Sequence, residues 1–461
     1  MSVPSWVRDA IVYLIFPDRF ARSQAAAPGL EPWDAPPTRH GYKGGDLLGI
    51  VEHLDHLEDL SVNTLCLTPV FRATANHRYH THDFFEIDPL LGGRAAFDTL
   101  LERCHARGIR LVLDGVFDHV GRGFHPFVDV VENGSDSPYA SWFRIHDFPL
   151  RPYESNPGYD GWAGLGALPR LNTDEPAVRE YLMTVAEHWA RAGIDGWRWD
   201  TPAEIRTPGF WEELRSRVKA INPELYLVGE VWTDASEWLR GDRFDGTTNY
   251  WFGGHALAFV GGLDLSLCED IDYPVKHPVD AVAFAEFAEG LIARYSDNHL
   301  AASLVLDASH DTPRILSLMQ GRADRVILVK LLEYTFFGAP TLYYGEEVGL
   351  LGEGDPDCRA GFPWQGPWHT QIHDALRSLG ALRRRSPALR HGEYRRLFAQ
   401  GAGYAFSRKL EGERLGVFVN VGDEAVAMPI EGQATLEWGR ADIRPGEVVL
   451  PARGGAVIRL D

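Results

Sequence analysis

The sequence lacks the features that mark several classes of protein. None of its apolar runs approaches the roughly 18 residues that a membrane-spanning helix needs. The N-terminal stretch 1–10 has neither the basic start nor the apolar segment of a secretory signal. The apolar fraction of 45% is ordinary for a globular protein, which disfavours a disordered chain. We therefore expect a globular protein without a membrane anchor.

Cysteine and positive charge are both scarce. The four cysteines lie far apart without metal-ligand spacing, so we expect reduced, mostly buried thiols in a cytoplasmic protein. With 45 Lys and Arg against 65 Asp and Glu, the formal net charge is −20. Such a charge repels phosphate groups, which argues against nucleic acid, anionic membranes and polyanionic substrates as partners. An acidic surface that only keeps the protein soluble explains the charge equally well.

Aromatic residues are plentiful, with 14 Trp, 16 Tyr and 23 Phe. Aromatic rings stack on the apolar faces of sugar rings, but they also fill protein cores. Aromatic content alone therefore favours a core role and identifies no ligand.

Apolar, β-rich runs alternate with segments of helical period through most of the chain. Four segments, 47–60, 94–108, 176–193 and 210–221, place apolar residues three and four positions apart. Strands that alternate with helices indicate parallel βα units, and eight in succession predict a closed (β/α)8 TIM barrel. The candidate strands are 10–16, 62–68, 109–117, 195–200, 225–230, 244–250 (the weakest), 302–308 and 340–345.

Two regions depart from this alternation. Residues 119–175 are rich in Gly, Pro, Asp and aromatic residues and show no clear helix, which predicts a small inserted domain over the barrel mouth. Short alternating strands predict a C-terminal antiparallel β-sandwich domain over 392–461. The barrel then comprises 1–118 and 176–391. The Pro- and Ala-rich stretch 23–37 predicts a mobile loop.

Several candidate strands finish in polar residues, at the end of a barrel where chemistry is done. Side chains two apart on a strand point to the same face, so we expect Arg198 and Asp200 both to point into the barrel top. An internal ion pair without a catalytic role would explain this pair equally well. Other strand ends shift the balance toward a catalytic site, because they carry Asp114, Asp118, His119, Glu230, Trp232, His310 and Asp311.

Converging carboxylates and histidines can bind a metal or perform acid–base and nucleophilic chemistry. No ligand pair of the His-x-x-x-His type is present, so we expect no catalytic metal site. An Asp and a Glu on neighbouring strands suit glycoside cleavage, in which one carboxylate attacks and the other shuttles a proton.

These residues stand in stretches that resemble the α-amylase family of glycoside hydrolases (family 13), over nearly the whole chain. Within the family, the chain resembles most the neopullulanase, cyclomaltodextrinase and maltogenic amylase group. The stretches that carry the resemblance are 12-VYLIFPDRF-20, 44-GGDLLGI-50, 114-DGVFDH-119, 168-LPRLN-172, 196-GWRWD-200, 229-GEVW-232 and 309-SHDTPR-314.

The resemblance implies a retaining hydrolase that cleaves α-1,4 bonds of maltooligosaccharides, cyclodextrins, starch or pullulan. Asp200 matches the nucleophile, Glu230 the general acid/base, and Asp311 the third carboxylate, which grips the sugar hydroxyls. In a retaining enzyme the carboxyl groups of Asp200 and Glu230 should lie about 5–5.5 Å apart. The residues implied in substrate binding are Tyr79, Asp114, His119, Arg198, Trp232, His310, Asp355 and Arg359.

Two alternatives use the same fold. A transglycosidase or a glucosyl isomerase of the trehalose-synthase type would resolve the same intermediate with a sugar instead of water. A catalytically silent family member would typically have lost a carboxylate, whereas Asp200, Glu230 and Asp311 are all present.

The chain departs from the family pattern in ways that affect metal and partners. Asp118 stands where the first motif normally has Asn, which often supports a structural calcium. Asp is also an oxygen ligand, so a structural calcium stays open, and no cofactor is required. Thr201, directly after Asp200, accompanies α-1,4 preference in related α-glucosidases. Because the group's N-terminal β domain, which helps form a dimer, is missing, we expect a monomer or weak dimer.

Overall fold

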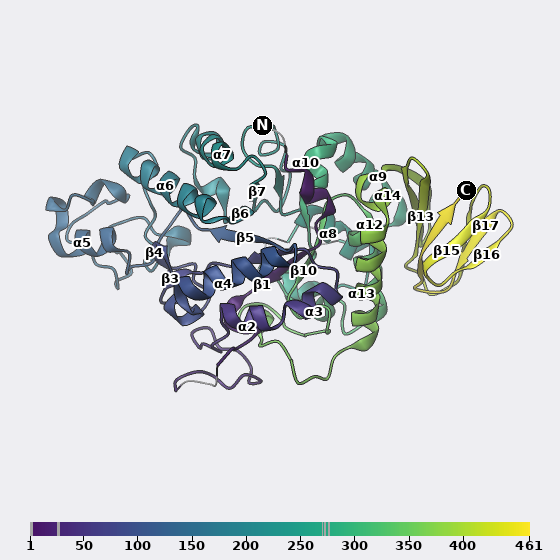
Figure 1. The fold of residues 1–461 in the computed structure, drawn as a ribbon, viewed down its shortest axis with the longest axis horizontal. Coiled ribbons are helices and arrows are strands. Elements are labelled where there is room, and N and C mark those ends of the chain that lie inside the picture. Colours follow the sequence, from purple (N-terminus) through teal and green to yellow (C-terminus); the bar gives the residue numbers. More distant parts are fainter. Residues whose placement is uncertain (1–2, 25–27, 270, 272, 275–276) are drawn as a thin grey trace.

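The molecule is elongated and has three parts along its long axis (Figure 1). The segment around α5 lies at one end, the barrel in the middle, and a group of strands near the C-terminus at the other end. The computed structural model describes residues 3–24, 28–269, 271, 273–274 and 277–461.

The predicted TIM barrel is present. Within the described residues, eight parallel strands form one sheet in the order β8-β7-β6-β5-β2-β1-β10-β9, and a parallel bridge between Thr248 and Leu304 closes it. The strands are β1 (Val12–Ile15), β2 (Thr64–Leu67), β5 (Arg110–Gly115), β6 (Gly196–Trp199), β7 (Tyr226–Gly229), β8 (Gly246–Thr247), β9 (Leu304–Val305) and β10 (Ala339–Tyr343). Each coincides with a predicted strand, because parallel barrel strands are buried on both faces and form apolar runs.

Helices surround the barrel, and one segment predicted as a single helix forms two. They are α1 (Pro17–Phe20), α2 (Leu47–Glu52), α3 (Leu54–Asp59), α4 (Gly93–Ala106), α6 (Pro176–Ala192), α7 (Phe210–Ile221), α8 (Tyr250–Val260), α9 (Ala281–Arg294), α10 (Asp297–Ala301), α11 (Ile315–Leu318), α12 (Ala323–Thr335), α13 (Thr370–Arg385) and α14 (Pro387–His391). The predicted helix 47–60 is interrupted at His53, between α2 and α3. The His53 ring stacks on Trp364 with centroids 3.6 Å apart. Because the two residues are far apart in the sequence, the local pattern around His53 could not reveal this contact.

Over the described part of the chain, no helix is both long and apolar enough to cross a membrane.

The segment between β5 and α6 contains a helix, contrary to the prediction. Helix α5 (His125–Asn133) has a proline in its first turn, a favourable position for proline. Its Phe127 ring contacts Phe143 and Tyr159, with centroids 5.1 and 4.9 Å away. Nine residues are too few for a helical period to stand out, so these aromatic contacts decide the local structure.

The loop after β2 forms a hairpin that was not predicted. Its strands are β3 (Phe71–Ala73) and β4 (Thr81–Ile87), and Tyr79 lies in the turn between them. The expected loop 23–37 includes residues 25–27, which lie outside the described residues. Short 3-10 helices complete the barrel part and its loops: η1 (Ser5–Asp9), η2 (Pro89–Leu91), η3 (Gly134–Asp136), η4 (Ala140–Trp142), η5 (Trp162–Gly164), η6 (Pro202–Glu204), η7 (Leu265–Cys268) and η8 (Asp357–Arg359).

The C-terminal part is the predicted antiparallel β-sandwich. Its strands are β11 (Glu393–Gln400), β12 (Gly403–Leu410), β13 (Glu413–Asn420), β14 (Val426–Pro429), β15 (Ala434–Gly439), β16 (Asp442–Arg444), β17 (Glu447–Leu450) and β18 (Gly455–Leu460). A five-stranded sheet has the order β11-β12-β13-β18-β15, and a three-stranded sheet has the order β14-β17-β16. Phe418, Met428 and Ile458 are buried in the core between the sheets.

Two buried arginines donate to carbonyl oxygens near the end of α12, and one of them, Arg408, joins the sandwich to the barrel. Arg408 of β12 donates to the carbonyl oxygen of Thr335, the last residue of α12, and its guanidinium lies 4.0 Å from the centroid of the Phe337 ring. Arg383 of α13 donates to the carbonyl oxygens of Tyr334 and Gly338. The carbonyl groups near the end of α12 that have no partner within the helix therefore accept hydrogen bonds from guanidinium groups of two different parts of the chain.

Candidate active site

A buried guanidinium group stands at the centre of the barrel mouth. Asp114 on β5 and Arg198 on β6 are register partners, and Asp200 follows directly after β6. Arg198 Nη1 lies 2.9 Å from both carboxylate oxygens of Asp114 and 2.8 Å from Asp200 Oδ1. Arg198 Nη2 lies 2.7 Å from Glu230 Oε1, at the end of β7. The structure therefore contains the expected Arg198–Asp200 pair and adds two further carboxylates to the same guanidinium. We call these four residues the Arg198 cluster.

Burial and neighbouring charge act in opposite directions on the carboxyl groups of the Arg198 cluster. Burial raises the pKa of Asp200 well above its usual range, while the Arg198 guanidinium opposes that rise. Burial also raises the pKa of Asp114 to about 6, against the lowering effects of Arg198 and the Tyr79 hydroxyl. Asp200 is 9% exposed and Glu230 7%, so both carboxylates keep some access to the mouth.

The Glu230 carboxylate is held by three donors. One oxygen accepts from Arg198 and from the indole nitrogen of Trp232 at 3.1 Å. The other accepts from the backbone N–H of Thr201 at 3.1 Å. Thr201 has φ +37° and ψ +53°, a left-handed conformation that is strained for a β-branched residue. The strained backbone thus directs an N–H group at the carboxylate expected to act as acid and base.

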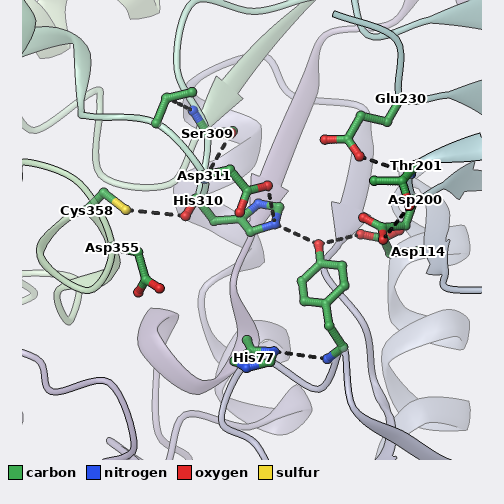
Figure 2. Close-up of polar contacts among 12 residues, drawn as sticks. His77, Asp114, Asp200, Thr201, Glu230, Ser309, His310, Asp311, Asp355 and Cys358 are labelled. Atoms are coloured by element: carbon green, nitrogen blue, oxygen red, sulfur yellow. Dashed lines mark hydrogen bonds and ion pairs between the residues drawn. The ribbon is translucent and has the colours of Figure 1, made fainter. Parts of the chain in front are cut away.

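Asp311 faces these residues from the loop after β9. The carboxyl groups of Asp200, Glu230 and Asp311 point toward a common space beside His310 (Figure 2). His310 Nε2 lies 3.1 Å from Asp311 Oδ2 and 2.6 Å from the Tyr79 hydroxyl oxygen. The structure therefore brings the three predicted catalytic residues to one place.

Tyr79 links the two sides of the mouth. Its hydroxyl group donates to Asp114 Oδ2 at 2.8 Å, so its oxygen is left to accept from His310 Nε2. Burial lowers the pKa of His310 well below its usual value, which favours a neutral ring with its hydrogen on Nε2. The two rings stack with centroids 5.4 Å apart. The single N–H group of this neutral ring lies beside the Tyr79 hydroxyl group and the Asp311 carboxylate, and so orients both side chains at the barrel mouth.

His119 is buried, and its ring nitrogens are available for hydrogen bonds to a ligand. Among the described residues, neither of its ring nitrogens has a hydrogen-bond partner. Its ring lies beside Trp162 of η5, with centroids 5.3 Å apart, and Nδ1 lies 3.7 Å from Asp118 Oδ2. An unsatisfied buried imidazole in a mouth of this kind is a candidate ligand for a sugar hydroxyl group.

The loop that follows β10 reaches the site through Arg359. Its guanidinium donates to the carbonyl oxygen of His310 at 2.8 Å and lies 3.2 Å from Asp311 Oδ1. It also pairs with Asp355 at 3.1 Å. Asp355 lies to one side of the carboxylates in Figure 2. Arg359 thus contacts Asp311 directly, and Asp355 is connected to Asp311 through Arg359.

Trp232 is fixed by an aromatic contact that the sequence did not indicate. Its indole stacks on Tyr250 of α8 with centroids 4.2 Å apart. Tyr250 in turn donates to Ser309, the residue before His310, at 2.7 Å. Helix α8 was not among the predicted helices, so Tyr250 could not be assigned to the site.

The surroundings of Asp118 do not fit a structural calcium ion. Asp118 Oδ1 accepts from the Arg170 guanidinium at 2.8 Å, so a positive group already occupies the position from which a cation would be bound. In the part of the chain that the structure describes, no group of three or more His, Cys, Asp or Glu side chains could hold a metal ion. The charge that Asp118 requires is supplied by Arg170 instead.

Comparison with known proteins supports the same family. The model of the α-amylase catalytic domain matches residues 14–387. A cyclomaltodextrinase from Geobacillus thermopakistaniensis is 40% identical over 444 residues, which cover 95% of this chain and 73% of that protein. The crystal structure of a debranching enzyme from Nostoc punctiforme superimposes with a TM-score of 0.92 at 45% identity, covering 100% of this chain and 99% of that one. A cyclic α-maltosyl-(1→6)-maltose hydrolase from Arthrobacter globiformis has a TM-score of 0.90 at 37% identity, covering 100% of both chains. The chain therefore belongs to the α-amylase family of glycoside hydrolases.

Proposed function

We propose that the protein is a retaining α-glucan hydrolase that cleaves α-1,4-glucosidic bonds. The observation that carries this proposal is that Asp200 and Glu230, from adjacent strands, contact the same guanidinium at the barrel mouth. Two carboxylates so placed can act on one glycosidic bond. Maltooligosaccharides, cyclodextrins, starch or pullulan are the proposed substrates.

The proposed reaction has two steps. Asp200 attacks the anomeric carbon while protonated Glu230 gives its proton to the departing glycosidic oxygen, which leaves as the alcohol of the released sugar. Ionised Glu230 then takes a proton from water, whose oxygen attacks the anomeric carbon and displaces Asp200 as carboxylate. Two inversions retain the α-configuration. A separation of about 5–5.5 Å between the two carboxyl groups remains a prediction.

The residues around these carboxylates have proposed roles in holding the glucosyl unit at the cleavage point. Asp311, His119 and His310 would hydrogen-bond its hydroxyl groups, and Tyr79 would stack against its ring. Arg198 and Asp114 would hold Asp200 in place. Trp232 would line the leaving-group side, whereas Asp355 and Arg359 would bind the next sugar toward the non-reducing end.

Product analysis tests the proposal and separates it from the alternative. The enzyme is incubated with cyclodextrin, pullulan, starch and maltotriose, and the products are followed by chromatography and by NMR of the first anomer formed. Shorter α-configured sugars are expected. Predominantly longer or isomerised products would instead indicate a transglycosidase or a glucosyl isomerase. Products that first form in the β-configuration would contradict double displacement.

Several broader features also belong to the proposal. We assign 1–118 and 176–391 to the catalytic barrel, 119–175 to an inserted domain, and 392–461 to the C-terminal domain. A cytoplasmic location is supported by the free, buried thiols of Cys66, Cys104 and Cys358, which suit a reducing compartment. A monomer or weak dimer is expected, and light scattering at several protein concentrations would measure it.

A further inference from the structure

One arginine of the inserted segment reaches two residues outside that segment. Arg170 Nη2 donates to Asp118 Oδ1 at 2.8 Å, to Glu204 Oε2 at 3.0 Å, and to the Glu204 carbonyl oxygen at 3.1 Å. The side chain of Arg170 is 28% exposed, that of Asp118 3% and that of Glu204 38%, so the junction is buried at Asp118 and partly open to water at Glu204. The guanidinium thus ties the loop after β5 to η6.

Helix η6 follows Thr201 directly, and its position determines where the Thr201 backbone lies. The Glu204 N–H donates to the Thr201 carbonyl oxygen at 3.0 Å. At the first residue of η6, the Trp211 indole donates to the Pro202 carbonyl oxygen at 3.2 Å. Because Thr201 is held in a strained left-handed conformation, surrounding contacts must maintain it. Arg170 and Trp211 supply such contacts at the two ends of η6.

We propose that Arg170 is a positioning residue that fixes the carboxyl group of Glu230 through Glu204 and Thr201. The inference rests on the proposed function, in which Glu230 is the general acid. The connection is continuous: Arg170 holds Glu204, Glu204 bonds Thr201, and the Thr201 N–H donates to Glu230 Oε2 at 3.1 Å. Asp200 depends on it less, because Thr201 contacts it only by the longer Oγ1–Oδ2 distance of 3.4 Å, whereas Arg198 Nη1 lies 2.8 Å from it.

This difference between the two carboxylates gives the inference a specific signature. A sugar leaves poorly as an alkoxide and needs the proton of Glu230, whereas 4-nitrophenolate leaves without protonation. Displacing the general acid should therefore slow cleavage of maltotriose much more than release of 4-nitrophenol from a 4-nitrophenyl maltooligosaccharide. Loss of overall structure would slow both reactions alike.

The test measures kcat and KM of Arg170→Met for both substrates. We expect kcat/KM for maltotriose, which reports the first step, to fall at least about tenfold more than kcat/KM for the nitrophenyl substrate. Arg170→Lys, which keeps the charge but not the guanidinium, should give a smaller loss of the same kind. The matched control is Arg144→Met. Arg144 pairs with Asp174 at 3.1 Å, with both side chains about half exposed, and this variant should behave as the unchanged protein.

The outcomes separate the inference from the proposed function. Equal losses on both substrates, or no loss, would overturn the role of Arg170. If Arg170→Met does not fold, Glu204→Gln carries the test, because it weakens the same contact from the other side. Glu204→Gln should likewise lose more activity on maltotriose than on the nitrophenyl substrate, and equal losses would overturn the inference. Failure of the unchanged enzyme to cleave either substrate would count against the proposed function itself.

Discussion

Among the residues that the structure describes, two buried clusters each join one cation to three carboxylates. In the first, the Arg198 cluster, the carboxylates are Asp114, Asp200 and Glu230. In the second, which we call the Lys330 cluster, Lys330 Nζ lies 3.0, 2.9 and 2.7 Å from carboxylate oxygens of its three partners. These partners are Asp307, Glu333 and Glu346.

The two clusters resemble each other in charge and differ in access. Burial raises the pKa of Glu333 well above its usual range, as it does for Asp200. All four residues of the Lys330 cluster are at most 2% exposed, whereas Asp200 is 9% exposed and lies at a strand end beside His310. A shifted pKa therefore does not distinguish a catalytic carboxyl group from a structural one. Access and the neighbouring hydrogen-bond donors make the distinction.

The largest expected effect is on activity, in the Arg198 cluster. Asp200→Ala should lower kcat by at least about 10⁴-fold, because no other group forms the covalent intermediate. Initial rates on a 4-nitrophenyl maltooligosaccharide measure it. Glu333→Gln is the control from the Lys330 cluster: its folded fraction should keep kcat within about twofold, since Glu333 is far from any reacting bond. Activity in Asp200→Ala close to that of the unchanged enzyme would refute the nucleophile.

A second substitution separates acid catalysis from attack. Glu230→Gln keeps the size of the side chain but cannot exchange a proton, so kcat for maltotriose should fall by about 10²–10⁴-fold. The first step on a nitrophenyl substrate should be much less affected, and a burst of nitrophenol should be seen in a stopped-flow trace. An equal effect on both substrates would argue that Glu230 is not the proton donor.

Substitution in the Lys330 cluster should lower the stability of the folded protein. Lys330→Met leaves three buried carboxylates without their cation and should lower the free energy of unfolding by about 3–5 kcal/mol. Chemical denaturation monitored by tryptophan fluorescence measures it. The control is Arg322→Met, which removes an exposed ion pair with Asp324 and should cost less than about 1 kcal/mol. Similar values for both variants would show that burial does not set the contribution of the Lys330 cluster.

The pH dependence of activity should report the Arg198 cluster. Asp200 attacks only when ionised, and burial raises its pKa, so activity should be lost as pH falls through that raised value. The acid limb of kcat/KM should lie at higher pH than an exposed aspartate would give, with about a tenfold loss per pH unit. Constant activity across the acidic range would contradict the two-carboxylate mechanism.

The pH dependence of stability should report the Lys330 cluster. Burial raises the pKa of Glu346 from 4.5 to about 8, so the folded protein holds a proton that the unfolded chain releases in this range. This contribution is fully present below about pH 4.5 and is lost as pH rises toward 8. The free energy of unfolding of Glu346→Gln should therefore fall less steeply with pH, by up to about 1.4 kcal/mol per pH unit. Identical slopes between pH 5 and 8 would show that Glu346 does not take up this proton.

The fold was largely predictable because most barrel strands are apolar runs, and several of them are followed by a polar residue. The run 195–200 became β6 followed by Asp200, and 225–230 became β7 followed by Glu230. The predictions of secondary structure that were wrong concern segments whose structure depends on contacts between residues far apart in the sequence. The interruption at His53 accompanies stacking on Trp364, and α5 packs on aromatic rings that the local sequence does not identify.

The candidate site divides in the same way. Carboxylates at strand ends could be read from the sequence, because barrel geometry brings these ends together. The hydrogen bond from the Thr201 backbone N–H group to Glu230 could not be predicted, because every residue except proline has such a donor. Arg170 lies in the stretch 168–172, which resembles the family. No role could be predicted for it, because its contact with Glu204 joins residues 34 positions apart in the chain. Residue type predicts chemistry, whereas partners depend on the completed fold.

The junction between barrel and sandwich limits how the enzyme can be shortened. Truncation after α14 would remove Arg408, and the carbonyl oxygen of Thr335 would lose its donor next to newly exposed apolar surface. A catalytic fragment made in this way should aggregate or unfold, even though every residue of the Arg198 cluster would still be present. Engineering of a minimal enzyme from this chain should therefore keep the whole sandwich and shorten surface loops instead.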